Sequence, residues 1–238
     1  MLRLILSLVS LFLVGAGAVK HLKKVDPKTY SVKKITSSIA LSGTGDHADW
    51  KRAHVLTDFN YPWNTGQPRP IKFRALHNDA WLYCLFDVED HDINIREKSN
   101  HKSEVASSTR AEIFFRANER LTPYYCLEID PLGRVLEYEA TYHRNFDTKW
   151  SWPAGHLIIE TAKRKNGYTV EVAISKTSLR ELGLLKDNTI QAGLFTAECF
   201  QEEDDEPEFK WISWVKPASK TPDFHIPSSF GVLQLMDK

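Results

Sequence analysis

The sequence predicts an all-β protein, specifically a β-sandwich with only minor short helices. Three observations predict this class. About ten short segments have the alternation or the apolar composition of β-strands, turn-forming residues separate them, and only one segment has the character of a short helix. Short strands at this spacing favour two packed sheets over a helical or α/β fold.

The first two strands are expected at residues 71–76 and 81–88. The first alternates between apolar and mostly polar side chains, which indicates a half-buried strand. The second is apolar nearly throughout, as is typical of a strand buried on both faces. The turn-forming residues 77–80 join them. A short helical turn over residues 49–53 precedes this pair, with Trp50 buried.

The middle and the end of the chain continue the pattern. Asn166-Gly167 is a strong hairpin signal between two alternating segments. A single short helix is expected from Ser175, and Gly183 ends it. The remaining strands are expected at residues 111–117, 124–130, 134–142, 157–163, 168–174, 189–198, 210–215 and 231–235.

The first 34 residues are expected to lie outside this domain. Residues 1–18 have a charged start at Arg3, a short apolar run and an A-x-A-like end at Ala16 to Ala18, which together are typical of a secretory signal peptide. The apolar run is shorter than the roughly 20 residues that a membrane-spanning helix needs. We therefore expect export to the periplasm or the extracellular space, a leader or linker over residues 19–34, and one domain over residues 35–238.

The charge balance argues against some partners. Lys and Arg number 31 and Asp and Glu number 31, and no basic block provides the positive surface that nucleic acid requires. We expect no nucleic-acid partner, and no membrane partner after signal cleavage.

The three cysteines do not form a recognisable motif. Cys84, Cys126 and Cys199 have no C-x-x-C spacing, so neither a zinc site nor a disulfide framework is indicated. We expect them to be small buried residues of the strands.

A group of carboxylates is the first candidate for a binding site. In the strand from Ala111, alternation separates an apolar set from a face that bears Glu112. If the next two strands are its neighbours, Glu128, Glu137 and Glu139 share that face with aromatic residues. Carboxylates bind sugar hydroxyl groups and aromatic rings pack on the apolar face of a sugar, so this surface favours carbohydrate. The alternative is an ordinary solvated polar face.

The loop that follows is the second candidate. Tyr142, Arg144, Trp150 and Trp152 lie close together where strand alternation stops. Exposed Trp and Arg are typical of recognition surfaces. The alternative is that the loop folds its tryptophans back onto the sandwich. Phe224, in a proline-flanked loop before the last strand, is a candidate for another wall of the site.

A metal site has only weak support. Asp90 and Asp92 follow a buried strand and are the better candidates for structural calcium. The acidic segment 201–208 lacks the ligand spacing of a calcium loop. No cofactor is firmly indicated.

Several motifs resemble one family. Asp49-Trp50-Lys51-Arg52-Ala53 resembles its opening motif, residues 108–115 (STRAEIFF) look like its S-D-R-V-E-I-F-F strand, residues 167–174 (GYTVEVAI) look like G-Y-x-V-E-x-A-I, and residues 212–214 and 229–233 match its ending. In order and spacing these motifs are similar to carbohydrate-binding module family 9, over nearly all of the domain.

The resemblance implies a family 9-like or DOMON-like β-sandwich that binds sugar between aromatic side chains, with structural calcium in some members. The family's glutamate falls on Glu112, and the aromatic residue before the last strand falls on Phe224. The chain also departs from the family, since Thr109 replaces an Asp, Ala106 stands where a Trp often lies, and Glu128 stands at an expected Arg. Trp150 and Trp152 are our candidates for the missing wall.

These observations lead to one expected function and two alternatives. The expected function is an exported, non-catalytic carbohydrate-binding protein associated with polysaccharide degradation, with a polysaccharide or oligosaccharide as partner. The first alternative is a glycoside hydrolase that uses paired carboxylates. The second is a haem-binding sandwich, which needs a core Met ligand, whereas the chain has only Met1 and Met236.

Overall fold

The computed structural model describes residues 26–99, 101–200 and 207–237. The expected signal peptide and residues 19–25 of the expected leader lie outside these residues. Within the described ranges no helix has the length and apolar character needed to cross a membrane.

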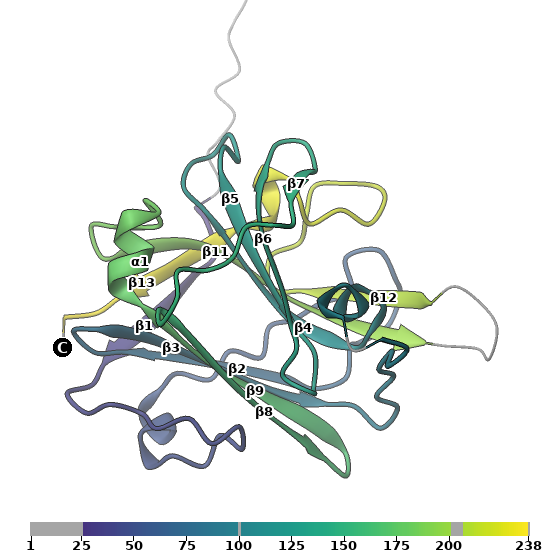
Figure 1. Ribbon diagram of the computed structural model, residues 1–238, viewed down its shortest axis with the longest axis horizontal. Coiled ribbons are helices and arrows are strands. Elements are labelled where there is room, and N and C mark those ends of the chain that lie inside the picture. Colours follow the sequence, from purple (N-terminus) through teal and green to yellow (C-terminus); the bar gives the residue numbers. More distant parts are fainter. Residues whose placement is uncertain (1–25, 100, 201–206, 238) are drawn as a thin grey trace, which may run out of the picture.

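Two sheets pack face to face and form the expected sandwich (Figure 1). The first sheet has the strand order β7-β6-β5-β4-β11-β13-β1, and β10 and β12 also pair with β11. The second has the order β1-β2-β3-β9-β8, so β1 belongs to both and joins them. In Figure 1 the helix α1 and the strand β12 lie at opposite ends of the molecule.

The strands that were expected from alternation and apolar composition are all present. They are β2 (Ile71–His77), β3 (Trp81–Glu89), β4 (Arg110–Arg116), β5 (Tyr124–Ile129), β6 (Val135–Thr141), β8 (Leu157–Arg164), β9 (Gly167–Ser175), β11 (Thr189–Phe200), β12 (Glu208–Ser213) and β13 (Gly231–Leu235). The prediction of an all-β fold with minor helices is confirmed. Those helices are α1 (Lys176–Glu181) and the short 3-10 turns η1 (Ala48–Arg52), η2 (Lys102–Ser107) and η3 (Pro227–Ser229).

The strand β1 (Thr29–Lys34) corrects the expected leader boundary, because residues 29–34 belong to the domain. The residues of β1 pair in parallel first with β13 and then with β2. Tyr30 and Val32 are buried in the core, and Ser31 between them is partly exposed. The segment is too short and too basic for this alternation to show clearly in the sequence. The short strands β7 (Asn145–Asp147) and β10 (Leu185–Lys186) were also not expected.

The main core lies between the sheets. Alternate residues of β4 and β5 point into it, among them Ile113, Phe115 and Leu127, where they meet Phe73 and Phe86 of the second sheet. Trp50 of η1 packs in a separate cluster on the outer face of the second sheet. The three cysteines are buried and free, as expected.

Candidate functional site

A pocket of about 300 Å³ opens on the outer face of the first sheet. This volume is at the lower end of the range of small-molecule sites. Side chains of β4, β5, β6 and β12 form its base, and loops before β2 and before β13 complete it. Its polar centre consists of Arg110, Glu112 and Glu128, and its aromatic walls include Trp63, Tyr138, Phe146, Trp211, Phe224 and His225.

Strand alternation and register place the two glutamates side by side. In β4, Ile113 and Phe115 point into the core, so Glu112 points to the opposite face. Glu112 and Glu128 are direct partners across the β4–β5 pair. Directly opposite side chains on antiparallel strands lie on the same face about 5 Å apart, which brings both carboxylates to the base of the pocket.

A single arginine lies between these carboxylates. The Nε atom of Arg110 is 2.8 Å from Oε1 of Glu112 and 2.8 Å from Oε2 of Glu128. Its Nη1 donates to the backbone carbonyl groups of Ala106 and Ser108, both at 3.1 Å. The guanidinium is also 5.2 Å from the ring centre of Trp211, within the range of a cation–π contact. All three charged side chains are buried.

Burial changes the proton equilibrium at this centre. Loss of hydration, opposed by Arg110 and supported by the charge of Glu128, raises the pKa of Glu112 from its ordinary 4.5 to about 8. The Tyr138 hydroxyl donates to Oε1 of Glu128 at 2.7 Å. Burial also raises the pKa of Tyr138 well above its ordinary range, so this hydroxyl keeps its proton. The centre therefore offers both hydrogen-bond donors and acceptors.

Aromatic rings supply the apolar part of the pocket. Phe224 stacks on Phe195 with ring centres 4.0 Å apart and 14° between the planes, which fixes its position. Trp63 and Trp211 lie against Phe224 at 5.2 Å and 5.7 Å. A second group is formed by Phe146 together with Tyr138 and His225. Phe146 is 40 % exposed and presents open ring surface.

A charged cluster forms one rim. Asp223 accepts a hydrogen bond from His143 at 2.8 Å and one from Arg144 at 3.3 Å. Burial alone would raise the pKa of Asp223, but these contacts leave it below its ordinary value. Burial lowers the pKa of His225 to about 3, so its ring is neutral. Its Nδ1 lies 3.0 Å from the Tyr124 hydroxyl.

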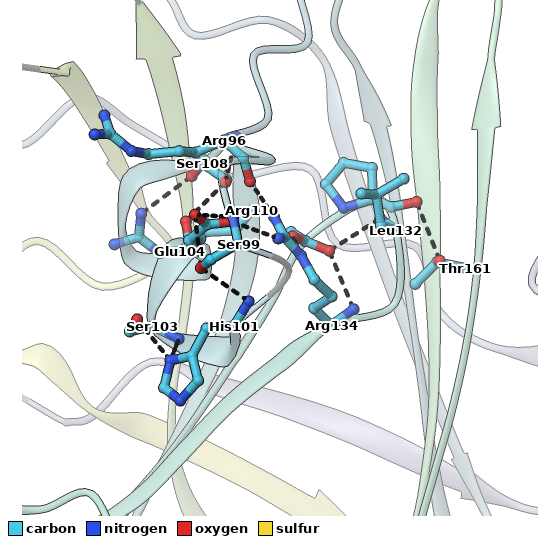
Figure 2. Close-up of polar contacts among 12 residues, drawn as sticks. Arg96, Ser99, His101, Ser103, Glu104, Ser108, Arg110, Leu132, Arg134 and Thr161 are labelled. Atoms are coloured by element: carbon cyan, nitrogen blue, oxygen red, sulfur yellow. Dashed lines mark hydrogen bonds and ion pairs between the residues drawn. The ribbon is translucent and has the colours of Figure 1, made fainter.

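A buried ion-pair network holds η2, which carries Ala106 to the pocket (Figure 2). Arg134 pairs with Glu104 of η2 at 3.1 Å and with Asp130 at 2.7 Å. Glu104 in turn accepts hydrogen bonds from the backbone and the hydroxyl of Ser99. The network fixes the loop whose carbonyl groups bind Arg110.

Four of the predicted site residues line the pocket. These are Glu112, Glu128, Arg144 and Phe224. Tyr142 is 55 % exposed next to the pocket, at the tip of the β6–β7 hairpin, and is not among its lining residues.

The two tryptophans that were expected to form a wall lie elsewhere. Trp152 is only 5 % exposed, and it packs in the main core against Phe115 while its Nε1 donates to Ser178. Trp150 packs on Tyr125, a residue of the core face of β5. Both therefore cover one end of the core, and the prediction that they form the missing wall is wrong for this pocket. The alternative of a loop folded back onto the sandwich is the one observed.

The expected grouping of the glutamates also needs correction. Glu128 lies opposite Leu136 in the β5–β6 pair, so Glu137 and Glu139 point to the other face of the sheet. Glu137 accepts a hydrogen bond from the backbone of Trp152 at 2.9 Å and helps to hold that loop.

Most of the other lining residues were not among the predicted site residues, and Arg110, Phe146 and Trp63 are examples. Arg110 lies two positions before Glu112 on the same strand face, and this alternation was a usable signal. Phe146 lies in the same loop as Trp150 and Trp152, and the local sequence does not distinguish its role from theirs. Trp63 lies in an irregular segment before β2, and no local pattern marks it.

The calcium candidates do not fit a metal site. Asp90 is buried and forms an ion pair with Arg69, and its carboxylate also accepts a hydrogen bond from the backbone of Asp92. A guanidinium therefore neutralises this carboxylate directly. In the part of the chain that the structure describes, no three His, Cys, Asp or Glu side chains gather as a metal site.

A β-sandwich with an aromatic pocket around buried carboxylates on one sheet face belongs to the class of ligand-binding modules. The sequence profile of the carbohydrate family 9 binding domain-like family matches residues 41–238. The chain therefore belongs to this family. No curated protein matches it.

Solved structures share the fold at low sequence identity. A Bacteroides uniformis protein proposed to bind carbohydrate superposes with a TM-score of 0.65 at 17% identity, over 89% of this chain and 100% of that one. A family 9 carbohydrate-binding module of Caldicellulosiruptor kristjanssonii in complex with glucose gives a TM-score of 0.58 at 17% identity, over 89% of this chain and 97% of that one. A family 9 module of the same organism in complex with cellotriose gives a TM-score of 0.57 at 16% identity, over 89% of this chain and 95% of that one.

Proposed function

We propose that this protein is an exported, non-catalytic carbohydrate-binding protein that acts in polysaccharide degradation, and that its ligand occupies the pocket around Arg110. The observation that carries the proposal is the pairing of a buried charged centre with aromatic walls in one pocket. Charged groups make strong hydrogen bonds to hydroxyl groups. Ring faces such as that of Phe146 pack on the apolar surface of a sugar.

The relatives support the ligand class. Two solved family 9 structures with this fold are complexes with glucose and with cellotriose. Their identity to this chain is only 17% and 16%, so the residues of the pocket itself are the main support for the ligand class. The proposed role in polysaccharide degradation follows from the expected ligand, because a module that binds a polysaccharide can keep degrading enzymes close to that polysaccharide.

Export is supported by the sequence of residues 1–18, which has the three regions of a signal peptide in order. Expression of the full chain with a C-terminal tag, followed by cell fractionation and N-terminal sequencing, tests this part. We expect a mature protein that begins after Ala18 and lies outside the cytoplasm. An intact N-terminus in the cytoplasmic fraction contradicts export.

The hydrolase alternative has one observation in its favour, the side-by-side carboxylates of Glu112 and Glu128. Both carboxylates are in contact with the same nitrogen of Arg110. Arg110 therefore lies between the two carboxylates, in the place that the scissile glycosidic bond must occupy when a pair of carboxylates flanks it. Binding therefore explains the arrangement better than hydrolysis does.

One experiment separates the two functions. The purified protein is applied to a glycan array and, in parallel, incubated with the same polysaccharides in an assay for new reducing ends. We expect binding without release of reducing ends, and binding that weakens in Phe146→Ala. Ile158→Ala, which removes a similarly exposed apolar side chain from β8 of the second sheet, is the matched control. Turnover, or equal binding by Phe146→Ala, contradicts the proposal.

A further inference from the structure

The buried centre of the pocket contains two carboxyl groups and only one cation. Arg110 faces two carboxylates, those of Glu112 and Glu128, each 2.8 Å from the same nitrogen atom. The exposed fractions of the three residues are 4 %, 2 % and 6 %, so water screens these charges poorly. A buried charge without a partner is unfavourable, and one of the two carboxylates lacks a full counter-charge.

No other cation of the described residues compensates for this charge. Arg144 is the only other basic side chain among the lining residues that the structure describes, and it is bound to Asp223 at the rim. Residues 201–206, which connect β11 to β12 in the sequence, are Gln, Glu, Glu, Asp, Asp and Glu and so contain no basic side chain.

The hydrogen bonding of the centre is incomplete as well. The Nε atom of Arg110 carries a single hydrogen and lies 2.8 Å from both Glu112 Oε1 and Glu128 Oε2, so it cannot satisfy both of these buried oxygen atoms, which have no other partner among the described residues. Nearly all buried polar atoms of folded proteins have such a partner. Their position at the base of an open pocket points to a ligand group that completes the set.

The raised pKa of Glu112 is consistent with two carboxyl groups that share one cation. Burial and the neighbouring Glu128 hold the pKa of Glu112 at about 8, so the empty pocket takes up a proton near neutral pH. A ligand that brings its own positive charge can replace that proton. The surrounding rings of Tyr138, Phe146 and Trp211 favour the same kind of ligand, because aromatic faces attract ammonium groups.

We propose that the pocket selects sugars with a free amine, and that the ammonium group of the sugar lies against Glu112 and Glu128. This inference rests on the proposed function and deepens it, because it names the class of sugar that the carbohydrate site prefers. The ammonium supplies the missing cation and donates to the carboxylate oxygen atoms, and charge-assisted hydrogen bonds of this kind are about twice as strong as neutral ones.

Three trisaccharides with the same linkage test the proposal: the β-1,4-linked trimers of glucosamine, N-acetylglucosamine and glucose. They differ only in the substituent at carbon 2. Calorimetric titration at pH 6, where an amine of this kind is protonated, is expected to show the glucosamine trimer binding about tenfold more tightly than the glucose trimer. Titration in two buffers with different ionisation enthalpies is expected to show release of about one proton for the glucosamine trimer only.

Glu112→Gln removes the charge and keeps the shape of the side chain. In this variant we expect the preference for the glucosamine trimer to fall to about twofold or less and the proton release to disappear. Glu160→Gln, an exposed substitution on β8, is the control and retains both. Equal affinity of wild type for the glucosamine and glucose trimers overturns the inference, and so does a preference that survives Glu112→Gln.

The array experiment keeps the two proposals apart. If the wild type binds neutral glycans and shows no preference for the amine, the inference fails and the carbohydrate site stands. If it binds no glycan at all, both fail.

Discussion

Glu112 of β4 and Glu128 of β5 are directly opposite partners, and both carboxylates contact the Nε atom of Arg110. Strand pairing thus places two buried carboxyl groups next to each other, and both contact one guanidinium. This relationship determines the charge, the proton equilibrium and the stability of the pocket.

The first prediction concerns Arg110. Arg110→Met leaves two adjacent buried carboxylates without a cation, and removal of one partner from a buried ion pair lowers stability by about 3–5 kcal/mol. Urea denaturation at pH 7 measures this loss. Arg110→Met combined with Glu112→Gln and Glu128→Gln is expected to recover a large part of it. If Arg110→Met alone is as stable as wild type, the three residues do not form a buried charge centre.

The second prediction concerns pH. Because the pKa of Glu112 is raised in the folded protein, from 4.5 to about 8, the folded state binds a proton that the unfolded state has lost. The contribution of this group to stability is therefore fully present below about pH 4.5 and decreases as the pH rises toward 8, by at most about 1.4 kcal/mol per pH unit.

Glu112→Gln removes this titration. The melting temperatures of wild type and variant are measured between pH 5 and 9. As the pH rises, we expect the melting temperature of the variant to increase relative to that of wild type. Other titrating groups act on both proteins equally and cancel in the difference. A difference that is constant with pH contradicts the raised pKa.

The third prediction concerns a carboxylate on the other sheet. Glu171 of β9 is fully buried and accepts hydrogen bonds from the backbone of Ser42 at 2.9 Å, from that of Gly43 at 2.6 Å and from the Trp50 indole at 2.7 Å. Its role is to hold the segment from Ser42 to Trp50 on the second sheet.

Glu171→Ala is expected to lower the free energy of unfolding by about 2–4 kcal/mol, because it leaves three buried donors unpaired. Affinity for the pocket ligand is expected to stay within about twofold of wild type under conditions where the variant is folded. Denaturation and calorimetry on the same sample measure both. A variant that stays stable but loses ligand places Glu171 in binding instead.

The sequence was sufficient for the fold, because each expected strand carries its own signal. Alternation in β4 and β5 assigned Ile113 and Leu127 to the core and Glu112 to the other face, and the structure agrees. The strand β1 was not predicted, because its burial depends on two strands, β13 and β2, that lie far away in the sequence.

The site was predicted less completely, for two physical reasons. The face on which Glu137 lies depends on the register of β6 against β5, because a shift of one residue moves every side chain of a strand to the opposite face. Exposed and core tryptophans have the same local sequence character, so Trp152 and Trp211 could not be told apart until the tertiary packing was known.

The fourth prediction concerns Trp152. Its ring packs against Phe115 and Tyr125 in the core, and its indole donates to Ser178 at 3.0 Å. Trp152→Ala is expected to lower the free energy of unfolding by about 3–5 kcal/mol. Trp152→Phe keeps much of the volume and is expected to lose less than half as much. A ligand-binding defect in a Trp152→Ala protein of unchanged stability is the contrary result.

Two half-buried tryptophans can show whether sugar binds in the pocket around Arg110. Trp211 lines the pocket, whereas Trp150 packs on Tyr125 away from it. Calorimetric titration of Trp211→Ala and Trp150→Ala with the best ligand of the array measures the difference. We expect the affinity to fall about tenfold or more in Trp211→Ala and less than about twofold in Trp150→Ala. A larger loss for Trp150→Ala than for Trp211→Ala contradicts binding in this pocket.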